Sequence, residues 1–155
     1  MVASTDPAHN STHVPLDKAI KVTFNVYVER GDTFNDISLM AGEDKVASLQ
    51  SLNYSVITIY PSTALTSGTK YTVTIPRGAI KDVNCNPLKD PYTFSFTTVT
   101  LGDVNGDDLA DIQDLLFIAS KIGPVTNSES RKADVNKDNV VNILDILEIA
   151  PYINQ

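Results

Sequence analysis

Apolar and polar residues alternate in short runs along the first two thirds of the chain, which is the pattern of half-buried β-strands. Turn residues such as Gly31-Asp32 and Ser67-Gly68 separate these runs. The apolar members of the runs are Ile20, Val22, Phe24, Val26, Val28, Ile37, Leu39, Val56, Ile57, Ile59, Tyr71, Val73, Ile75, Phe94 and Phe96. Several short strands at this spacing predict an all-β sandwich from about residue 14 to residue 98.

The pattern changes after residue 98, where apolar residues begin to recur at helical spacing over residues 112–122 and 143–153. Between these two helices, Asn127 or Ser128 is placed to cap a short third helix. We therefore predict a mixed two-domain chain, with a β-sandwich at residues 1–98 and a small α module at residues 99–155.

Each of the two longer helices carries two apolar stripes. One pair of stripes is Leu115, Ile118, Ile122 and Ile146, Ile149, Ile153; the other is Ile112, Leu116, Ala119, with Phe117 beyond, and Ile143, Leu147, Ala150. One stripe per helix can form the core of so small a module. The second stripe is then left for another surface, since exposed contiguous apolar area marks an interaction site. Coverage by the β-domain is one alternative, and we favour a separate protein partner.

Charge is distributed unevenly between the two domains. Residues 1–100 hold nine acids and eight bases, whereas residues 101–155 hold ten acids and four bases. A net charge of −6 on the second part makes nucleic acid an improbable partner, because phosphate binding needs a basic patch. The chain contains no apolar run of the roughly 18–20 residues that a membrane span needs. The lone Cys85 cannot form an internal disulfide.

The acidity is concentrated in a twelve-residue loop that occurs twice, at residues 103–114 and 134–145. Oxygen donors at the first, third, fifth, seventh, ninth and twelfth places supply the six or seven ligands that Ca²⁺ takes at about 2.3–2.6 Å. The predicted ligands are Asp103, Asn105, Asp107, the Leu109 carbonyl, Asp111 and Asp114 in the first loop, and Asp134, Asn136, Asp138, the Val140 carbonyl, Asn142 and Asp145 in the second. With four carboxylates against three, the first loop is expected to bind its ion more tightly.

Both loops depart from the usual calcium-loop pattern at two places. The sixth place holds Asp108 and Asn139 instead of glycine, and these residue types tolerate the positive φ that a sharp turn requires. The closing residue is an aspartate in both loops, which must approach the ion more closely than a glutamate. No amphipathic helix precedes Asp103, so we expect a constitutive structural pair of ions and a module that does not fold without them.

The duplicated loop-helix segments, Gly102 to Ile122 and Ala133 to Ile153, resemble a dockerin module. The resemblance implies two EF-hand-like calcium loops, a cohesin module of another protein as partner, and a role in assembling or anchoring a cellulosome for polysaccharide degradation. It also implies a protein that is extracellular, either secreted or attached to the cell surface, and monomeric before it binds. The recognition places that the resemblance carries over are Ile112, Gln113, Ala119, Ser120, Ile143, Leu144, Ala150 and Pro151, to which the second stripes add Leu116, Phe117 and Leu147. Their apolar character resembles a type II dockerin.

The first domain resembles a bacterial Ig-like domain in three stretches, Ser4 to Phe24, Ala64 to Ile75 and Ile80 to Thr98. Tyr71 follows a Leu-x-x-Gly-Thr turn and is expected to form a tyrosine-corner hydrogen bond to upstream backbone. An Ig-like domain beside a dockerin resembles an X-module, which implies a stabilising role for residues 1–98.

The main prediction is a non-catalytic protein-interaction module rather than an enzyme. The alternative is a carbohydrate-binding or adhesive module with purely structural calcium, although Trp is absent and Tyr27, Tyr54 and Tyr60 form no evident platform in the sequence. A hydrolase is disfavoured because the loops account for nearly all clustered carboxylates. His9 and His13 precede the first predicted strand, in a segment expected to be mobile.

Overall fold

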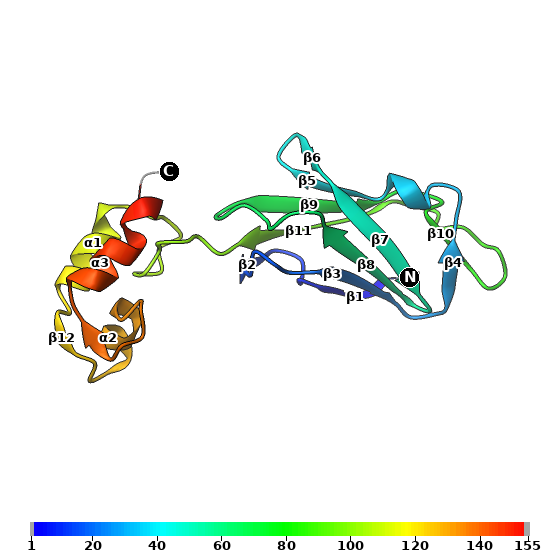
Figure 1. Cartoon of the computed structure of the whole chain (residues 1–155). Coiled ribbons are helices and arrows are strands. Elements are labelled where there is room, and N and C mark those ends of the chain that lie inside the picture. The colour runs from blue at the N-terminus through cyan, green and yellow to red at the C-terminus, as the bar shows by residue number, and fades with distance from the viewer. Residues whose placement is uncertain (1, 154–155) are drawn as a thin grey trace. The chain divides into compact units, whose positions relative to one another are not determined.

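The computed structural model of the chain describes residues 2–153 and forms two compact units, Met1–Val99 and Thr100–Gln155 (Figure 1). The first unit consists of β-strands and one 3₁₀ turn, η1 (Phe34–Asp36), and the second of short helices joined by loops. No helix among the described residues is long and apolar enough to cross a membrane.

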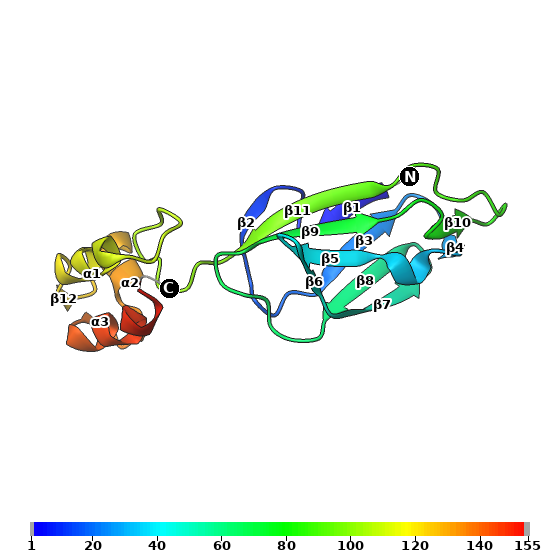
Figure 2. The same cartoon turned by 90° about the horizontal axis from the view of Figure 1, so that it is seen from above.

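Two sheets make up most of the first unit (Figure 2). The four-stranded sheet has the order β1 (Val2–Asp6), β3 (Ile20–Phe24), β8 (Val56–Pro61) and β7 (Ser48–Asn53). The five-stranded sheet has the order β2 (Ser11–Val14), β11 (Tyr92–Thr98), β9 (Lys70–Ile75), β5 (Ser38–Ala41) and β6 (Asp44–Val46). A further pair joins β10 (Ile80–Asp82) to β4 (Val28–Arg30). All these pairs are antiparallel except β2 with β11.

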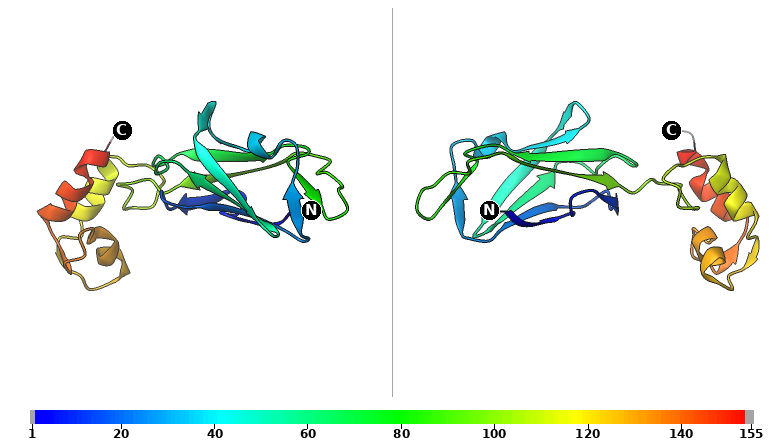
Figure 3. Two further views of the ribbon diagram at one scale, coloured as in Figure 1. Left: turned by 45° about the vertical axis from the view of Figure 1, so that its right-hand side comes forward. Right: turned by 180° about the vertical axis from the view of Figure 1, so that it is seen from behind.

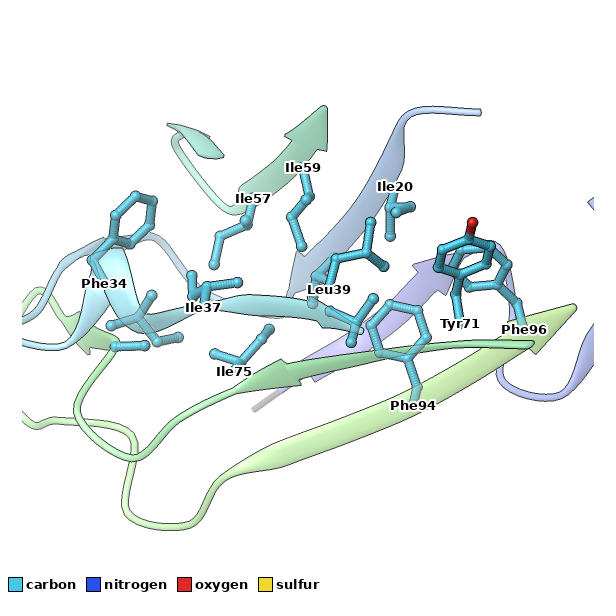
Figure 4. Close-up of a cluster of buried hydrophobic side chains, with 14 of the residues drawn as sticks. Ile20, Phe34, Ile37, Leu39, Ile57, Ile59, Tyr71, Ile75, Phe94 and Phe96 are labelled. Atoms are coloured by element: carbon cyan, nitrogen blue, oxygen red, sulfur yellow. The ribbon is translucent and has the colours of Figure 1, made fainter. Parts of the chain in front are cut away.

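The apolar members of the strands form one core between the two sheets. In β3 the alternation buries Ile20, Val22 and Phe24 and leaves Lys21 exposed. Side chains from both sheets point into the same space, as the close-up in Figure 4 shows. The buried members are Val14, Ile20, Val22, Phe24, Val28, Phe34, Ile37, Leu39, Ile57, Ile59, Leu65, Tyr71, Val73, Ile75, Ala79, Ile80, Phe94 and Phe96. The sandwich-like arrangement agrees with the period-two pattern of the sequence.

Tyr71 forms the predicted tyrosine-corner hydrogen bond. The backbone N–H of Thr66, five residues upstream, donates to the Tyr71 hydroxyl at 2.8 Å. The Tyr71 ring is buried and stacks on Phe96, with 5.7 Å between ring centroids. The hydroxyl thus ties the turn before β9 to the core.

The expectation of a mobile segment before residue 14 was wrong, because β1 and β2 lie there. His13 belongs to β2, and the ring nitrogen Nδ1 of His9 accepts the backbone N–H of Ser95 in β11 at 3.1 Å. Strand β1 lies at the edge of its sheet and buries none of its residues fully, so it shows no apolar alternation. Because this apolar alternation is missing, the sequence pattern did not predict the strand.

Asp82 closes the turn after β10. Its carboxylate accepts the side-chain amide of Asn86 and the backbone N–H groups of Asn86 and Asn84, each at 2.9 Å. The side-chain hydrogen bond from Asn86 is the main cause that lowers the pKa of Asp82. Cys85 lies exposed in the same turn. These groups serve a turn and do not form an acid–base pair.

The second unit contains α1 (Ile112–Ala119), α2 (Ser128–Ala133), α3 (Ile143–Ile149) and a 3₁₀ turn, η2 (Ala150–Tyr152). A short ladder pairs β12 (Gly123–Pro124) with β13 (Val140–Val141). Helices α1 and α3 lie side by side (Figure 3). Asn127 caps α2, since its Oδ1 accepts the backbone N–H of Ser130 at 2.9 Å, as one of the two predicted caps.

The first predicted stripe of each helix supplies the small core of this unit. Its fully buried apolar residues are Ile118, Ala133, Val141 and Ile149, and the residues packed against them include Leu115, Phe117, Ile146 and Ile153. Ile122 was expected in this core, yet it is 63% exposed. The reason is that α1 ends at Ala119, so helical spacing no longer places Ile122 over the preceding turns.

We predict that Tyr71→Phe lowers the free energy of unfolding of the β unit by about 1 kcal/mol, because the Thr66 N–H loses its acceptor. Denaturant unfolding followed by circular dichroism measures the change. Tyr27→Phe is the control, since that ring is 63% exposed, and it should alter stability by less than about 0.5 kcal/mol. Equal effects of the two substitutions would contradict a role for the corner.

Candidate calcium loops and docking face

The first residue of each loop holds the turn that follows it. Asp103 accepts backbone N–H groups from Gly106 (2.7 Å) and Asp107 (3.2 Å) at Oδ1, and from Asp108 (2.9 Å) at Oδ2. In the second loop Asp134 accepts the backbone N–H groups of Asp138 and Asn139, each at 3.1 Å, which correspond to the bonds from Asp107 and Asp108. The loops therefore wrap around the carboxylate at their first place.

The third and fifth places continue this arrangement in the first loop. Oδ1 of Asn105 accepts the Asp107 N–H at 2.9 Å, and Oδ1 of Asp107 accepts the Leu109 N–H at 3.0 Å. The amide Nδ2 of Asn105 donates to Oδ2 of Asp107 at 3.0 Å. Each side chain is thus held on the inner side of its own turn by a local Asx-type hydrogen bond.

The second loop repeats these bonds place for place. Asn136 accepts the Asp138 N–H at 3.0 Å, and Asp138 accepts the Val140 N–H at 2.8 Å. The Val140 carbonyl, the predicted seventh-place donor, accepts Nδ2 of Asn142 at 3.3 Å. The two loops share the spacing of their oxygen-bearing side chains. Because the same hydrogen bonds recur at the same places, the backbone of both loops follows the same path.

The closing aspartates join the start of each loop to the start of the following helix. Oδ1 of Asp114 accepts from Val104 (2.7 Å) and Asn105 (3.0 Å), and its Oδ2 accepts from Asp111 (2.9 Å). Asp145 makes the equivalent three bonds. Both side chains are fully buried. A glutamate would carry its carboxylate one methylene further out, so the short side chain fits this three-bond clasp.

The ninth place of each loop is also the N-cap of the next helix. Asp111 accepts the Gln113 N–H, and Asn142 accepts the Leu144 N–H, each at 2.7 Å. Together with the closing aspartates they form a capping box at the start of α1 and of α3. The residues predicted as ligands therefore also begin the helices that carry the candidate docking face.

Positive φ occurs at the sixth place, as expected, with 69° at Asp108 and 70° at Asn139. It also occurs at the fourth place, where Gly106 has a φ of 88° and Lys137 of 63°. Positive φ at the fourth place was not predicted, although the glycine at position 106 was a signal for it. The second loop accepts strain at Lys137 that the first loop avoids by using glycine.

The oxygens at the predicted ligand places have the chemistry of a calcium site. The salt bridge between Lys132 and Glu129 lies outside both loops. Within residues 100–153, no three acidic side chains bring a carboxylate oxygen each within 4.8 Å of the others. Like charges keep apart in this way unless a cation compensates them, and carboxylate, amide and carbonyl oxygens are the donors that calcium takes.

The second predicted stripe of each helix is exposed. On α1, Ile112 and Leu116 are 53% and 55% exposed; on α3, Ile143, Leu144 and Leu147 are 54–60% exposed. We call these five residues the docking face. The remaining predicted contact residues Gln113, Ala119, Ser120, Ala150 and Pro151 are exposed as well. Five large apolar side chains on two adjacent helices form a patch of the kind that marks an interaction site.

Phe117 differs from the other predicted contact residues. It is half-buried and packs against the core of the second unit, and the ammonium of Lys121 lies 5.5 Å from the centre of its ring. Phe117 therefore serves the interior at least in part. Its position in sequence, one residue from the exposed Leu116, did not reveal this.

Two family models match the chain. A model of the bacterial Ig-like domain matches residues 1–98, and a model of the dockerin type I domain matches residues 101–154. Because the second model is named for type I, the type II-like class inferred from the apolar recognition places stays a prediction. No curated protein matches the chain.

Solved structures resemble part of the chain. The crystal structure of CopC from Methylosinus trichosporium OB3b is 16% identical, with a TM-score of 0.51, over 64% of this chain and 93% of that one. The N-terminal part of the bacterial S-layer protein SbsC is 20% identical, with a TM-score of 0.46, over 63% of this chain and 23% of that one. At 16% identity the likeness to CopC shows the fold of the β unit alone.

We predict that Asp114→Asn destabilises the second unit by at least about 3 kcal/mol, because a charged acceptor of three backbone N–H groups is replaced by a neutral amide. Loss of helical circular dichroism on denaturation in calcium measures it. Glu148→Gln is the matched control, since it makes the same acid-to-amide change at an exposed residue of α3, and it should change stability by less than about 0.5 kcal/mol. If Asp114→Asn left the stability of the second unit unchanged, the three hydrogen bonds to Asp114 would not hold the loop closed.

Proposed function

This chain belongs to the bacterial Ig-like family through residues 1–98 and carries a dockerin domain at residues 101–154, and we propose that it is a calcium-folded docking module. Dockerin domains bind cohesin modules, and dockerin type I domains bind calcium. The partner is accordingly a cohesin on another protein, and the chain's part in the pair is adhesion rather than catalysis.

The observation that carries this proposal is the docking face. Ile112 and Leu116 on α1 and Leu147 on α3 expose more than half of their surface although the unit is small. A chain that could bury these side chains within its own small core would gain free energy by doing so. Their exposure is best explained by a partner that removes them from water, with Gln113, Ser120 and Pro151 at the rim.

Calcium enters as a structural component, with one ion in each loop. Residues 103–114 would hold the first and residues 134–145 the second, through the twelve donors named above. When bound, the ions supply the positive charge that the loop carboxylates lack in the chain itself. The first loop, with four carboxylates, would bind its ion more tightly than the second, and neither ion takes part in a reaction.

The Ig-like unit is the companion of the docking unit. Its large core allows it to fold independently of calcium. In the manner of an X-module, it would stabilise the dockerin that follows it in the sequence. Such a pair belongs outside the cell, secreted or attached to the surface, as part of a cellulosome. The apolar docking face favours a type II-like cohesin, and a monomer before the complex forms.

A second candidate function is supported by an aromatic pair in the β unit. Tyr27 and Tyr54, which are 63% and 71% exposed, lie with ring centroids 5.6 Å apart. They line a shallow pocket of about 340 Å³, to which Asn25 and Ser55 also contribute. Exposed rings beside amide and hydroxyl groups suit the apolar face and hydroxyls of a sugar, so the tyrosines are closer to a platform than the sequence suggested.

We predict that Leu147→Asp weakens cohesin binding by about 30-fold or more, because it places a charge in the apolar centre of the interface. Calcium-dependent folding should survive, since the side chain is 59% exposed. A pull-down against a panel of cohesins, with calcium or with chelator, measures binding. Leu49→Asp, at a 73% exposed leucine of β7, is the control and should bind as the parent chain does.

Two results would count against the docking proposal. If no cohesin is retained in calcium, the chain has another partner or none. If Leu147→Asp unfolds the second unit, this stripe belongs to the core.

For the second candidate, Tyr27→Ala should abolish any retardation of the chain in polysaccharide affinity gels, because it removes one ring of the pair. Tyr60→Ala, at a 48% exposed tyrosine of β8 that does not line this pocket, is the matched control. Migration that no polysaccharide retards would remove this candidate.

A further inference from the structure

The first calcium loop contains Asn105-Gly106, the one Asn-Gly pair in the sequence. Asparagine followed by glycine is chemically labile, because no side chain hinders the glycine nitrogen from reaching the asparagine carboxamide. Gly106 has open space where a Cβ would lie. The loop therefore presents an intrinsically reactive pair at the third and fourth of its twelve places.

In the folded loop both reacting groups are held by hydrogen bonds. The nucleophile, the backbone N–H of Gly106, donates to the carboxylate of Asp103 at 2.7 Å. The electrophile, the Asn105 carboxamide, is held at both ends, accepting the Asp107 N–H at 2.9 Å and donating to Oδ2 of Asp107 at 3.0 Å. The negative charge of Asp103 also opposes removal of the Gly106 proton. Attack therefore requires the loop to open.

From this geometry we infer that Asn105 is a site of spontaneous deamidation that the closed first loop protects and that loss of calcium exposes. The calcium dependence rests on the proposed function of the loop. The reactivity of the pair rests on the sequence, and its protection in the closed loop rests on the hydrogen bonds.

The reaction needs no reagent other than water. The Gly106 nitrogen forms a bond to Cγ of Asn105, and the Cγ–Nδ2 bond breaks, releasing ammonia that carries away the Gly106 proton. The resulting succinimide is hydrolysed. Water that breaks the Cγ–N bond gives aspartate, and water that breaks the original peptide C–N bond gives isoaspartate, whose main chain runs through Cγ.

The two products differ in their effect on the loop. Aspartate at position 105 loses the amide that donates to Asp107 but keeps an oxygen at the third place, where a carboxylate is an ordinary calcium ligand. Isoaspartate lengthens the main chain between the third and fourth places, so Asp103 no longer meets the N–H groups of Gly106 and Asp107 in the same register. Isoaspartate at position 105 would therefore accumulate irreversibly with the time that the chain spends without calcium.

The second loop provides an internal control. Asn136 makes the same two bonds to Asp138, at 3.0 and 3.2 Å. The next residue is Lys137, whose side chain hinders its nitrogen. The two asparagines thus share their fold and their place in the loop, and differ in the residue that follows.

The experiment incubates the full chain at neutral pH in calcium or in chelator, and measures deamidation by peptide mapping with mass spectrometry and isoaspartate by a methyltransferase assay. Calcium at about 100 times its dissociation constant lowers the open population about 100-fold, so Asn105 should convert up to about 100-fold faster in chelator. Asn136 should stay intact in both. Lys137→Gly, which relieves the positive φ at that place, should make Asn136 a second calcium-protected site.

The outcomes separate this inference from the proposed function. If calcium binds and raises the melting temperature but Asn105 converts equally fast with and without it, the protection is refuted and the docking function stands. If calcium changes neither folding nor conversion, the calcium loop itself is refuted. If Asn105 remains intact even in urea, the pair is not reactive and the inference fails.

Discussion

Two buried carboxylates organise the second unit. Asp114 and Asp145 have no exposed surface, and each accepts three backbone N–H groups drawn from the start of its loop and from the cap of its helix. A buried charge is tolerated only where it is hydrogen-bonded and compensated. The N–H groups supply the first requirement, and under the proposed function a calcium ion would supply the second. Loop closure and helix initiation are therefore one event, to which ion binding would be coupled.

This coupling also determines which helical surface remains free. The caps fix where α1 and α3 begin, at Ile112 and Ile143, and hence the rotation of each helix relative to its loop. With Ile118 and Ile149 directed into the core, helical periodicity leaves Leu116 and Leu147 on the opposite side. The docking face is thus a geometric consequence of the loops, which explains why a calcium-binding repeat and an apolar surface occur together.

The sequence predicted those features that a local period determines. Alternation gave the buried residues of β3 and β9, and donor spacing gave two loops with the same backbone path. It failed where the decisive interaction is non-local or absent from the pattern: β1 is a polar edge strand defined by its pairing with β3. Phe117 turns partly into the core although Leu116 does not, and Tyr27 meets Tyr54 from a distant segment. Such contacts depend on tertiary packing between distant segments, so a local sequence pattern cannot predict them.

The two units differ in the source of their stability. Among the described residues, eighteen apolar side chains are buried in the core of the β unit, whereas four are buried in the core of the second. A module of so few residues buries too little apolar surface to offset the entropy of ordering its chain, and metal binding is the usual supplement at that size. Depletion of calcium should then unfold one unit and spare the other. Under the proposed function, the β-sandwich would stay folded without calcium, and the docking helices would form only when calcium is bound.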